Sequence, residues 1–412
     1  FVVDTTAPTL SEVTPITTPS NDTTPSYKFT TNEAGTLSTS ISQGFSSPNP
    51  ANVTTGSTQT ITFNTLPAAT YSGQIITVTD ASGNAGSLVL PNFVIDTSTP
   101  NLIQVTAITT PSNDTTPSYK FTTTKAGTLS TSISQGFSSP DPNTVTTGSI
   151  QTITFNTLPE GTYTGKTITV TDAVGNAGSL TLPDFVIDTT APTLSQVTPI
   201  TTPSNNTTPS YVFTTNQAGT LTTSISQGFS TSSSVTSGPN QTVTFNTLPE
   251  GTYSNETITV TDVAGNTASL TLPDFVIDTT APNLIQVTAI TTPSNNTTPS
   301  YVFTTNEAGT LSTNISQGFS TSSSVTTGSN QTITFNALPE GTYSGKTITV
   351  TDAAGNTSSL TLPDFVIDTT APTLSEVTPI TTPSNNTTPS YQFTSNEAGT
   401  LSTSISQGFS SP

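Results

Sequence analysis

The segments QTITFN (residues 151–156) and KTITVTD (residues 166–172) decide the fold, because apolar and polar side chains alternate along both. A period of two places Ile153 and Phe155 on one face of an extended strand, and an equivalent apolar pair on one face of the next. The intervening threonines favour extended backbone through their branched β-carbon and keep the opposite face polar. Pro, Gly and Asn separate about seven such runs in roughly 90 residues, so the sequence predicts helix-free, two-sheet antiparallel β-sandwiches.

This pattern recurs along the whole chain at a pitch of one small domain. The phrase FVIDTTAP, or a close variant, marks each copy, and its aspartate recurs after 92, 92, 90 and 90 residues. Such a period is too long for one turn of a solenoid, so the sequence predicts a tandem array of separate domains. The predicted domains are residues 1–95, 96–187, 188–277 and 278–367, followed by a partial fifth domain at 368–412.

A length difference between copies locates one connection. The chain takes eight steps from Phe45 to Val53, but only six between the equivalent residues Phe229 and Val235. A deletion inside a strand would turn every following side chain to the opposite face, whereas connections tolerate such changes. The two missing residues are therefore predicted to lie in a loop.

One tyrosine of each complete copy follows a Leu-Pro pair, just before a late strand. This position suits a tyrosine corner, with the ring buried and the hydroxyl bonded to nearby backbone. A tyrosine that stacks on a bound ligand is the alternative. The tyrosines are Tyr71, Tyr163, Tyr253 and Tyr343.

The composition excludes several classes of function. Lys and Arg total 5 against 24 acidic residues, and a net charge of -19 repels nucleic acid and anionic lipid surfaces. No apolar run approaches the ~20 residues of a membrane helix, so direct membrane insertion is not expected. The chain lacks cysteine and histidine, which leaves no disulfide, zinc thiolate or nucleophile-base pair. We therefore expect no enzymatic activity, and no catalytic or cofactor-binding residue is predicted.

Several short phrases recur in a fixed order, namely DTTAP, NDTTP, GTY and TVTDAAGN or its variants. At this pitch, and over the whole chain, they resemble the bacterial Ig-like repeats of very large surface adhesins, including biofilm-associated and RTX-type adhesins. The resemblance implies an all-β chain of tandem Ig-like antiparallel sandwiches joined end to end as an elongated rod. It also implies an extracellular, cell-surface location and the function of a structural extender, or stalk, that projects a binding tip. The expected partners are the neighbouring repeats of the same chain.

Acidic residues gather at one end of each predicted domain. In an Ig-like topology the first strand begins at the same end as the turn between the last two strands, so Asp96 is expected near Asp172 and Asn176. Loops of the preceding domain, carrying Asp22 or Glu160 or their equivalents, approach the same junction. Calcium takes about six to eight oxygen ligands, so each junction is a candidate Ca²⁺ site, and the resemblance implies the same stiffening. The candidate metal ligands are Asp4, Asp80, Asp96, Asp172, Asp188, Asp262, Asp278, Asp352 and Asp368.

Other interpretations remain open at this point. The aspartates could simply cap turns and keep the array soluble, since no self-contained calcium loop is present. Glu33 is a weaker candidate, because Lys125 takes the equivalent position in the second copy and a lysine cannot ligate calcium. Two alternative functions are a self-assembling filament or sheath, in which other copies of the chain complete the partial domain, and direct binding of glycan or ice by the threonine-rich faces.

Overall fold

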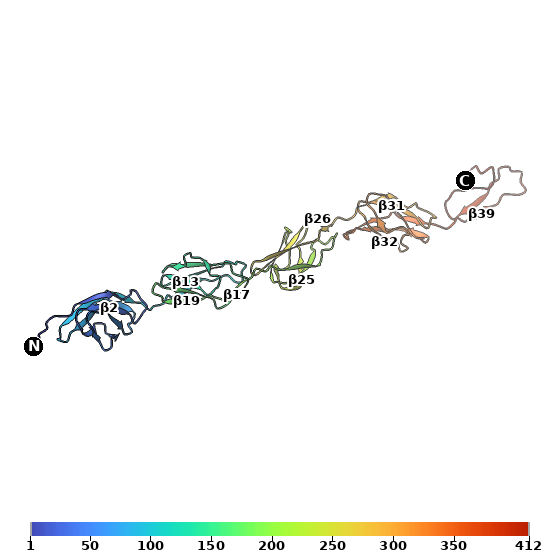
Figure 1. The fold of residues 1–412 in the computed structure, drawn as a ribbon. Coiled ribbons are helices and arrows are strands. Elements are labelled where there is room, and N and C mark those ends of the chain that lie inside the picture. Colours follow the sequence, from blue (N-terminus) through green and yellow to red (C-terminus); the bar gives the residue numbers. More distant parts are fainter. Residues whose placement is uncertain (1, 411–412) are drawn as a thin grey trace.

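The protein forms a row of β-sandwiches with the two chain ends at opposite ends of the row (Figure 1). This computed structural model describes residues 2–410. Strands, turns and irregular segments account for all of these residues, and no helix among them is long and apolar enough to cross a membrane. The all-β architecture predicted from the alternation is therefore confirmed.

The second repeat illustrates the sandwich. One sheet has the strand order β11-β12-β16-β14 and the other β15-β13-β18-β19, and every pair is antiparallel. These orders correspond to the ABED and CFG sheets of a constant-type Ig domain, with the short β15 added beside the C strand. The ten strands are β11 (Leu102–Thr106), β12 (Ser118–Thr123), β13 (Gly127–Thr131), β14 (Phe137–Ser139), β15 (Thr144–Val145), β16 (Gln151–Phe155), β17 (Gly161–Tyr163), β18 (Thr167–Thr171), β19 (Ala177–Thr181) and β20 (Phe185–Ile187).

The register of these strands turns the predicted apolar faces inward. Tyr119 lies opposite Ile153 between β12 and β16, and Leu129 lies opposite Val170 between β13 and β18. Ile153, Val170 and Phe155 are completely buried, so both sheets direct their apolar side chains into one interior. The alternating pattern is confirmed in β16 and β18, whose buried residues alternate with more exposed threonines.

The other repeats follow the same plan. The first contains β1 (Leu10–Thr14), β2 (Ser26–Thr31), β3 (Gly35–Thr39), β4 (Phe45–Ser47), β5 (Asn52–Val53), β6 (Gln59–Phe63), β7 (Ala69–Tyr71), β8 (Ile75–Thr79), β9 (Ala85–Val89) and β10 (Phe93–Ile95). The third contains β21 (Leu194–Thr198), β22 (Ser210–Thr215), β23 (Gly219–Thr223), β24 (Ser234–Val235), β25 (Gly238–Thr244), β26 (Gly251–Tyr253), β27 (Thr257–Asp262), β28 (Thr267–Thr271) and β29 (Phe275–Ile277). The fourth contains β30 (Leu284–Thr288), β31 (Ser300–Thr305), β32 (Gly309–Thr313), β33 (Ser324–Val325), β34 (Gln331–Thr334), β35 (Gly341–Tyr343), β36 (Thr347–Thr351), β37 (Thr357–Thr361) and β38 (Phe365–Ile367), and the partial fifth contains β39 (Leu374–Thr378) and β40 (Gln392–Ser395).

The shortened connection of the third repeat lies outside its main strands, as predicted. In the first repeat β4 and β5 flank this connection, whereas in the third a single bridge between Phe229 and Phe245 replaces the strand equivalent to β4. A complete repeat has nine or ten strands rather than about seven, because two- and three-residue strands such as β15 and β17 are too short to produce a sequence pattern.

Each complete repeat has its own hydrophobic core. The buried side chains form four separate clusters, and each cluster draws its residues from one repeat only. Among the described residues, no core cluster spans two repeats, so the sandwiches meet only at their ends.

A small ribbon closes the far end of each sandwich and positions the exit of the chain. In the second repeat β17 pairs with β20, and Ser112 makes a parallel bridge to Ile187 at the end of β20. Tyr163 on β17 donates its hydroxyl to the Pro159 carbonyl at 2.8 Å and stacks on Phe185 with ring centroids 4.8 Å apart. The backbone bond of the predicted tyrosine corner is confirmed, although the ring is half-buried because its other face borders solvent.

Candidate functional site

The end-to-end contact between successive repeats, here called a seam, is built around the linker aspartate. At seam 2–3 the backbone N–H of Asp188 donates to the Ser112 carbonyl of repeat 2 at 2.9 Å. The carbonyl of the same residue accepts from Nδ2 of Asn266 in repeat 3, also at 2.9 Å. One residue is thereby bonded to both repeats, which leaves almost no free linker. The equivalent sets are Ser20, Asp96 and Asn176 at seam 1–2, and Ser204, Asp278 and Asn356 at seam 3–4.

A second contact braces the seam at some distance from the linker. The N–H of Asn113 in repeat 2 donates to the Ala264 carbonyl of repeat 3 at 3.0 Å, and Asn205 makes the same bond to Ala354 at seam 3–4. The neighbouring Gly265 has φ +98, and a side chain there would come within 3.3 Å of the Asn113 amide. Glycine is needed for both reasons. Two contacts at separate points resist bending better than one.

Glutamates fasten the residues that follow the linker aspartate. The carboxylate of Glu160 accepts hydrogen bonds from the Thr189 backbone and hydroxyl and from the Thr190 hydroxyl, at 2.8 to 3.3 Å. These hydrogen bonds lower the pKa of Glu160. Glu250 and Glu340 make the same contacts at the next two seams. Ala68 occupies this position in repeat 1, so seam 1–2 lacks this carboxylate.

The predicted aspartates cap turns, with Oδ1 as the acceptor of the backbone amides. Oδ1 of Asp172 accepts from the backbone amides of Val174 and Asn176, and Oδ1 of Asp96 accepts from the Ser98 amide. The other oxygen, Oδ2, of these two aspartates faces a shared point at the base of the repeat. Turn capping and a cation site are therefore compatible within one carboxylate. Asp80, Asp262 and Asp352 cap the equivalent turns, and Asp4, Asp188, Asp278 and Asp368 cap their linkers.

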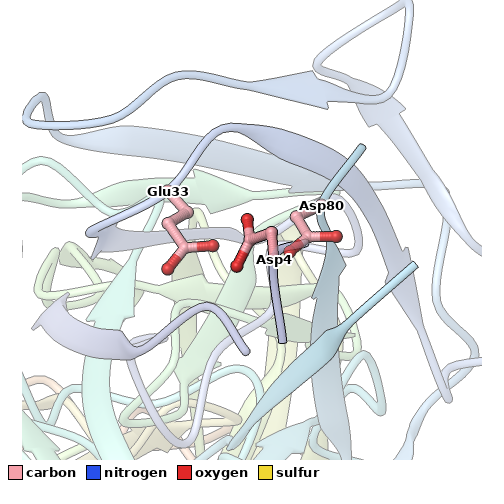
Figure 2. A group of neighbouring side chains, drawn as sticks. All are labelled: Asp4, Glu33 and Asp80. Atoms are coloured by element: carbon pink, nitrogen blue, oxygen red, sulfur yellow. The ribbon is translucent and has the colours of Figure 1, made fainter. Parts of the chain in front are cut away.

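At the base of repeat 1 the shared point is surrounded by three carboxylates. Asp4, Glu33 and Asp80 each place one oxygen so that all three oxygens lie within 4.8 Å of one another (Figure 2). Such a set fits a hard divalent cation, which takes carboxylate oxygens as ligands. The sequence argument ranked Glu33 below the aspartates because Lys125 replaces it in repeat 2, and the structure places a Glu33 oxygen beside those of Asp4 and Asp80. Asp22, in contrast, caps its own turn through Thr24.

At the base of repeat 2 an ammonium group occupies the shared point. Lys125 Nζ lies 2.7 Å from Asp96 Oδ2, 2.8 Å from Asp172 Oδ2 and 2.6 Å from the Ser98 carbonyl. The hydrogen bond from Lys125, followed by those from Ser98, lowers the pKa of Asp96 to about 2. Burial alone would raise the pKa of Asp172, but the bonds from Lys125 and Asn176 outweigh it and lower that pKa.

The remaining two repeats place other side chains at this point. Gln217 of repeat 3 donates from Nε2 to the Thr190 carbonyl at 3.2 Å, which is the neutral counterpart of the Lys125–Ser98 bond. Glu307 of repeat 4 has a pKa raised first by burial and then by the charges of Asp278, Asp352 and Glu250. Its Oε2 atom is buried and has no hydrogen-bond partner among the described residues. Among residues 2–410, no lysine forms an ion pair with these carboxylates of repeat 4.

The repeated sandwiches and their seams define the class of this protein as a tandem array of Ig-like domains. Residues 289–369 match the family model of the bacterial Ig-like domain, a match that begins just after β30 and runs through β38 into the following linker. No curated protein matches the chain.

Among solved structures, the chain is similar to the N-terminal eight Ig domains of Down Syndrome Cell Adhesion Molecule (10% identity, 82% of this chain and 52% of that chain, TM-score 0.25). It is also similar to SGBP-B of a Bacteroides ovatus mixed-linkage glucan utilization locus, in complex with a mixed-linkage heptasaccharide (14% identity, 81% of this chain and 93% of that chain, TM-score 0.18). A third similar structure is Escherichia coli alpha-2-macroglobulin activated by porcine elastase (9% identity, 92% of this chain and 46% of that chain, TM-score 0.20). This chain thus spans about half the length of the first and third of these chains.

Proposed function

We propose that this chain is a structural extender of a large extracellular bacterial adhesin, a stalk segment that projects a binding tip from the cell surface. The observation that carries the proposal is the linker aspartate, whose backbone is bonded to the repeats on both sides of each seam. A chain that only needed to tether domains would not need such bonds, because a flexible linker suffices. Because the seams are stiff and each repeat has its own core, the length of the rod increases with the number of repeats.

The dimensions and the surface suit this role. Strands of five or six residues plus loops give about 40 Å per repeat, so four complete repeats extend on the order of 160 Å. The net charge of -19 keeps neighbouring stalks apart, and neutral threonine and serine faces limit nonspecific adhesion.

We further propose that calcium stiffens the seams. Asp4, Glu33 and Asp80 would hold the ion at the base of repeat 1, and Asp278, Glu307 and Asp352 at the base of repeat 4. A divalent cation would offset the mutual repulsion of these carboxylates and draw the linker toward the turn of the same repeat. The chain would contribute carboxylate oxygens of these residues, including Oδ2 of the turn aspartates, which already accepts a hydrogen bond from the turn asparagine.

Small-angle scattering of the full chain, with calcium and then with a chelator, tests both parts of the proposal. We expect a rod-like profile in both conditions, with a larger spread of shapes after chelation. A profile that is rod-like but identical in both conditions would reject calcium stiffening and leave the stalk intact. A compact profile would reject the stalk. A chain carrying Asp278→Asn and Asp352→Asn serves as the matched control, because amides keep the turn caps but weaken cation binding, and its response to calcium should be reduced.

A further inference from the structure

The three seams between complete repeats share the bonds of the linker aspartate, but they differ in the other contacts between the repeats. Two kinds of contact are involved. The glutamate clamp is the carboxylate of Glu160 in repeat 2, or its equivalent, bonded to the two residues that follow the linker aspartate. The asparagine brace is the backbone bond from Asn113 in repeat 2, or its equivalent, to the turn of the next repeat.

Both contacts are present at seams 2–3 and 3–4. At seam 3–4 the carboxylate of Glu250 in repeat 3 accepts hydrogen bonds from the hydroxyls of Thr279 and Thr280, each at 2.9 Å. The Asn205 N–H of repeat 3 donates to the Ala354 carbonyl of repeat 4 at 3.1 Å. Since these bonds and those of the linker aspartate join the repeats at different residues, bending at this seam breaks several bonds at once.

Seam 1–2 has neither contact. Ala68 stands where the later repeats have the glutamate, so no side-chain oxygen is available there. The Ser98 hydroxyl, which corresponds to the Thr280 hydroxyl, donates instead to Asp96 in its own linker. Among the described residues, the Asn21 N–H makes no bond equivalent to the brace.

A larger residue in the turn accompanies the missing brace. Ala264 and Ala354, whose carbonyls accept the brace at the other two seams, are buried, with 8% and 9% of their surface exposed. Val174 has the equivalent position in repeat 2, and its larger side chain is only half-buried. The turn still lies beside repeat 1, because a side chain at Gly175 would come within 3.2 Å of the Asn21 amide. The two repeats are thus within reach of each other at this point but are not bonded there.

The Lys125 ammonium does not replace these contacts. Its partners are Asp96, Asp172 and the Ser98 carbonyl, of which Asp172 belongs to repeat 2 and the other two to the linker. The ion pairs therefore fasten the linker to repeat 2. Among the described residues, one hydrogen bond joins this linker to repeat 1, from the Asp96 N–H to the Ser20 carbonyl.

We propose that seam 1–2 is the joint at which the rod bends, and that the glutamate clamp and the asparagine brace hold seams 2–3 and 3–4 straight. Bending about one anchored residue needs only rotation of the backbone beside it, whereas bending a braced seam has to break hydrogen bonds at separate points. Repeats 2 to 4 then move as one body relative to repeat 1. This inference adds a defined joint to the proposed stalk, and it does not depend on calcium.

The absence of cysteine from the chain allows a direct test by paired spin labels in the full-length protein. Labels at Ser87 and Ser179 report on seam 1–2, and labels at Ser269 and Ser359 report on seam 3–4. All four serines are exposed and occupy equivalent positions on the last strand of the CFG sheet, so the two pairs are matched. The measurement is the width of the distance distribution, with a chelator present throughout so that bound calcium plays no part.

In the wild-type chain we expect a broader distribution at seam 1–2 than at seam 3–4. Ala68→Glu together with Val174→Ala supplies the residues of both missing contacts, and it should narrow the distribution at seam 1–2 toward that of seam 3–4. Glu250→Ala removes the clamp and should broaden the distribution at seam 3–4. Glu340→Ala makes the same change one seam further along and should leave seam 3–4 unchanged. Both glutamates are exposed, so neither substitution disturbs a core.

Equal widths at the two wild-type seams would overturn the inference, and so would an unchanged width at seam 1–2 in the double variant. Equal broadening of seam 3–4 by Glu250→Ala and Glu340→Ala would refute the role of the clamp. None of these results affects the proposed stalk, which stands as long as the scattering profile of the full chain is rod-like. A compact scattering profile would instead reject the stalk, whatever the widths of the label distributions.

Discussion

Replacing Ile168 with valine tests whether each sandwich is an independent folding unit. Ile168 lies on β18 and is completely buried, and its equivalents Ile76, Ile258 and Ile348 are buried to the same extent. Removing one methylene group from such a site costs about 1 kcal/mol. For a unit of 60–100 residues, that cost lowers the melting temperature by roughly 4–8 °C. The three unaltered repeats serve as internal references.

Differential scanning calorimetry of the full chain measures this shift. We expect about a quarter of the unfolding enthalpy to separate toward lower temperature, while the rest of the transition stays in place. Hydrogen exchange should then show faster amide exchange in β18 and its neighbours only. Ile150→Val makes the same chemical change at a side chain that is 59% exposed, and it should leave the profile unchanged.

A uniform shift of the whole transition would refute the reasoning. It would mean that the seams couple the repeats into one cooperative unit, despite four separate cores. The stalk would then unfold as a single body, and the repeat could not be treated as the unit of stability.

Further predictions concern the corner, the seam and pH. Tyr163→Phe deletes a hydrogen bond to a backbone carbonyl, so chemical denaturation should show a loss of about 1 kcal/mol confined to repeat 2. Asn266→Ala removes the donor to the Asp188 carbonyl and should broaden label distances across seam 2–3 without lowering the melting temperatures of the cores; unchanged distances would contradict the role of this bond. Hydrogen bonds from Lys125, followed by those from Ser98, lower the pKa of Asp96 from 3.8 to about 2, so the stabilisation is complete above about pH 4 and is lost as the pH falls through about 2. Denaturation curves between pH 2 and 7 should show that the free energy of unfolding falls less at acid pH in Lys125→Met than in the wild type. An equal fall in both proteins would count against the ion pair.

The sequence predicted the sandwich because the strands that carry its core are long enough to show a period of two. Ile153 and Phe155 are buried where the alternation places them, and the shortened connection of repeat 3 lies in a loop. The ribbon of β17 and β20 could not be predicted, since a three-residue strand displays hardly more than one repeat of any pattern. The parallel bridge from Ser112 depends on a long-range approach that no local signal encodes.

The candidate site was predicted in outline only. An Ig-like topology was enough to expect Asp96, Asp172 and Asn176 at one end of a repeat, and the structure brings these three together. The topology could not show that Glu33 and its equivalents also lie beside the linker aspartate and the turn aspartate. In the sequence, the replacement of Glu33 by Lys125 argued against a metal ligand at this position, because a lysine cannot ligate calcium. In the structure the Lys125 ammonium lies between Asp96 and Asp172, at the end of the repeat where Glu33 lies beside Asp4 and Asp80 in repeat 1.

The linker aspartate has a consequence for how the molecule changes length. Each repeat carries the serine carbonyl that fixes the next linker and the asparagine amide that fixes its own, at opposite ends of the same sandwich. Both halves of the joint therefore travel together whenever a copy is duplicated or lost. A gene that gains or drops one whole unit rebuilds the same backbone joint on either side, and the rod lengthens or shortens by one step with no new interface to evolve.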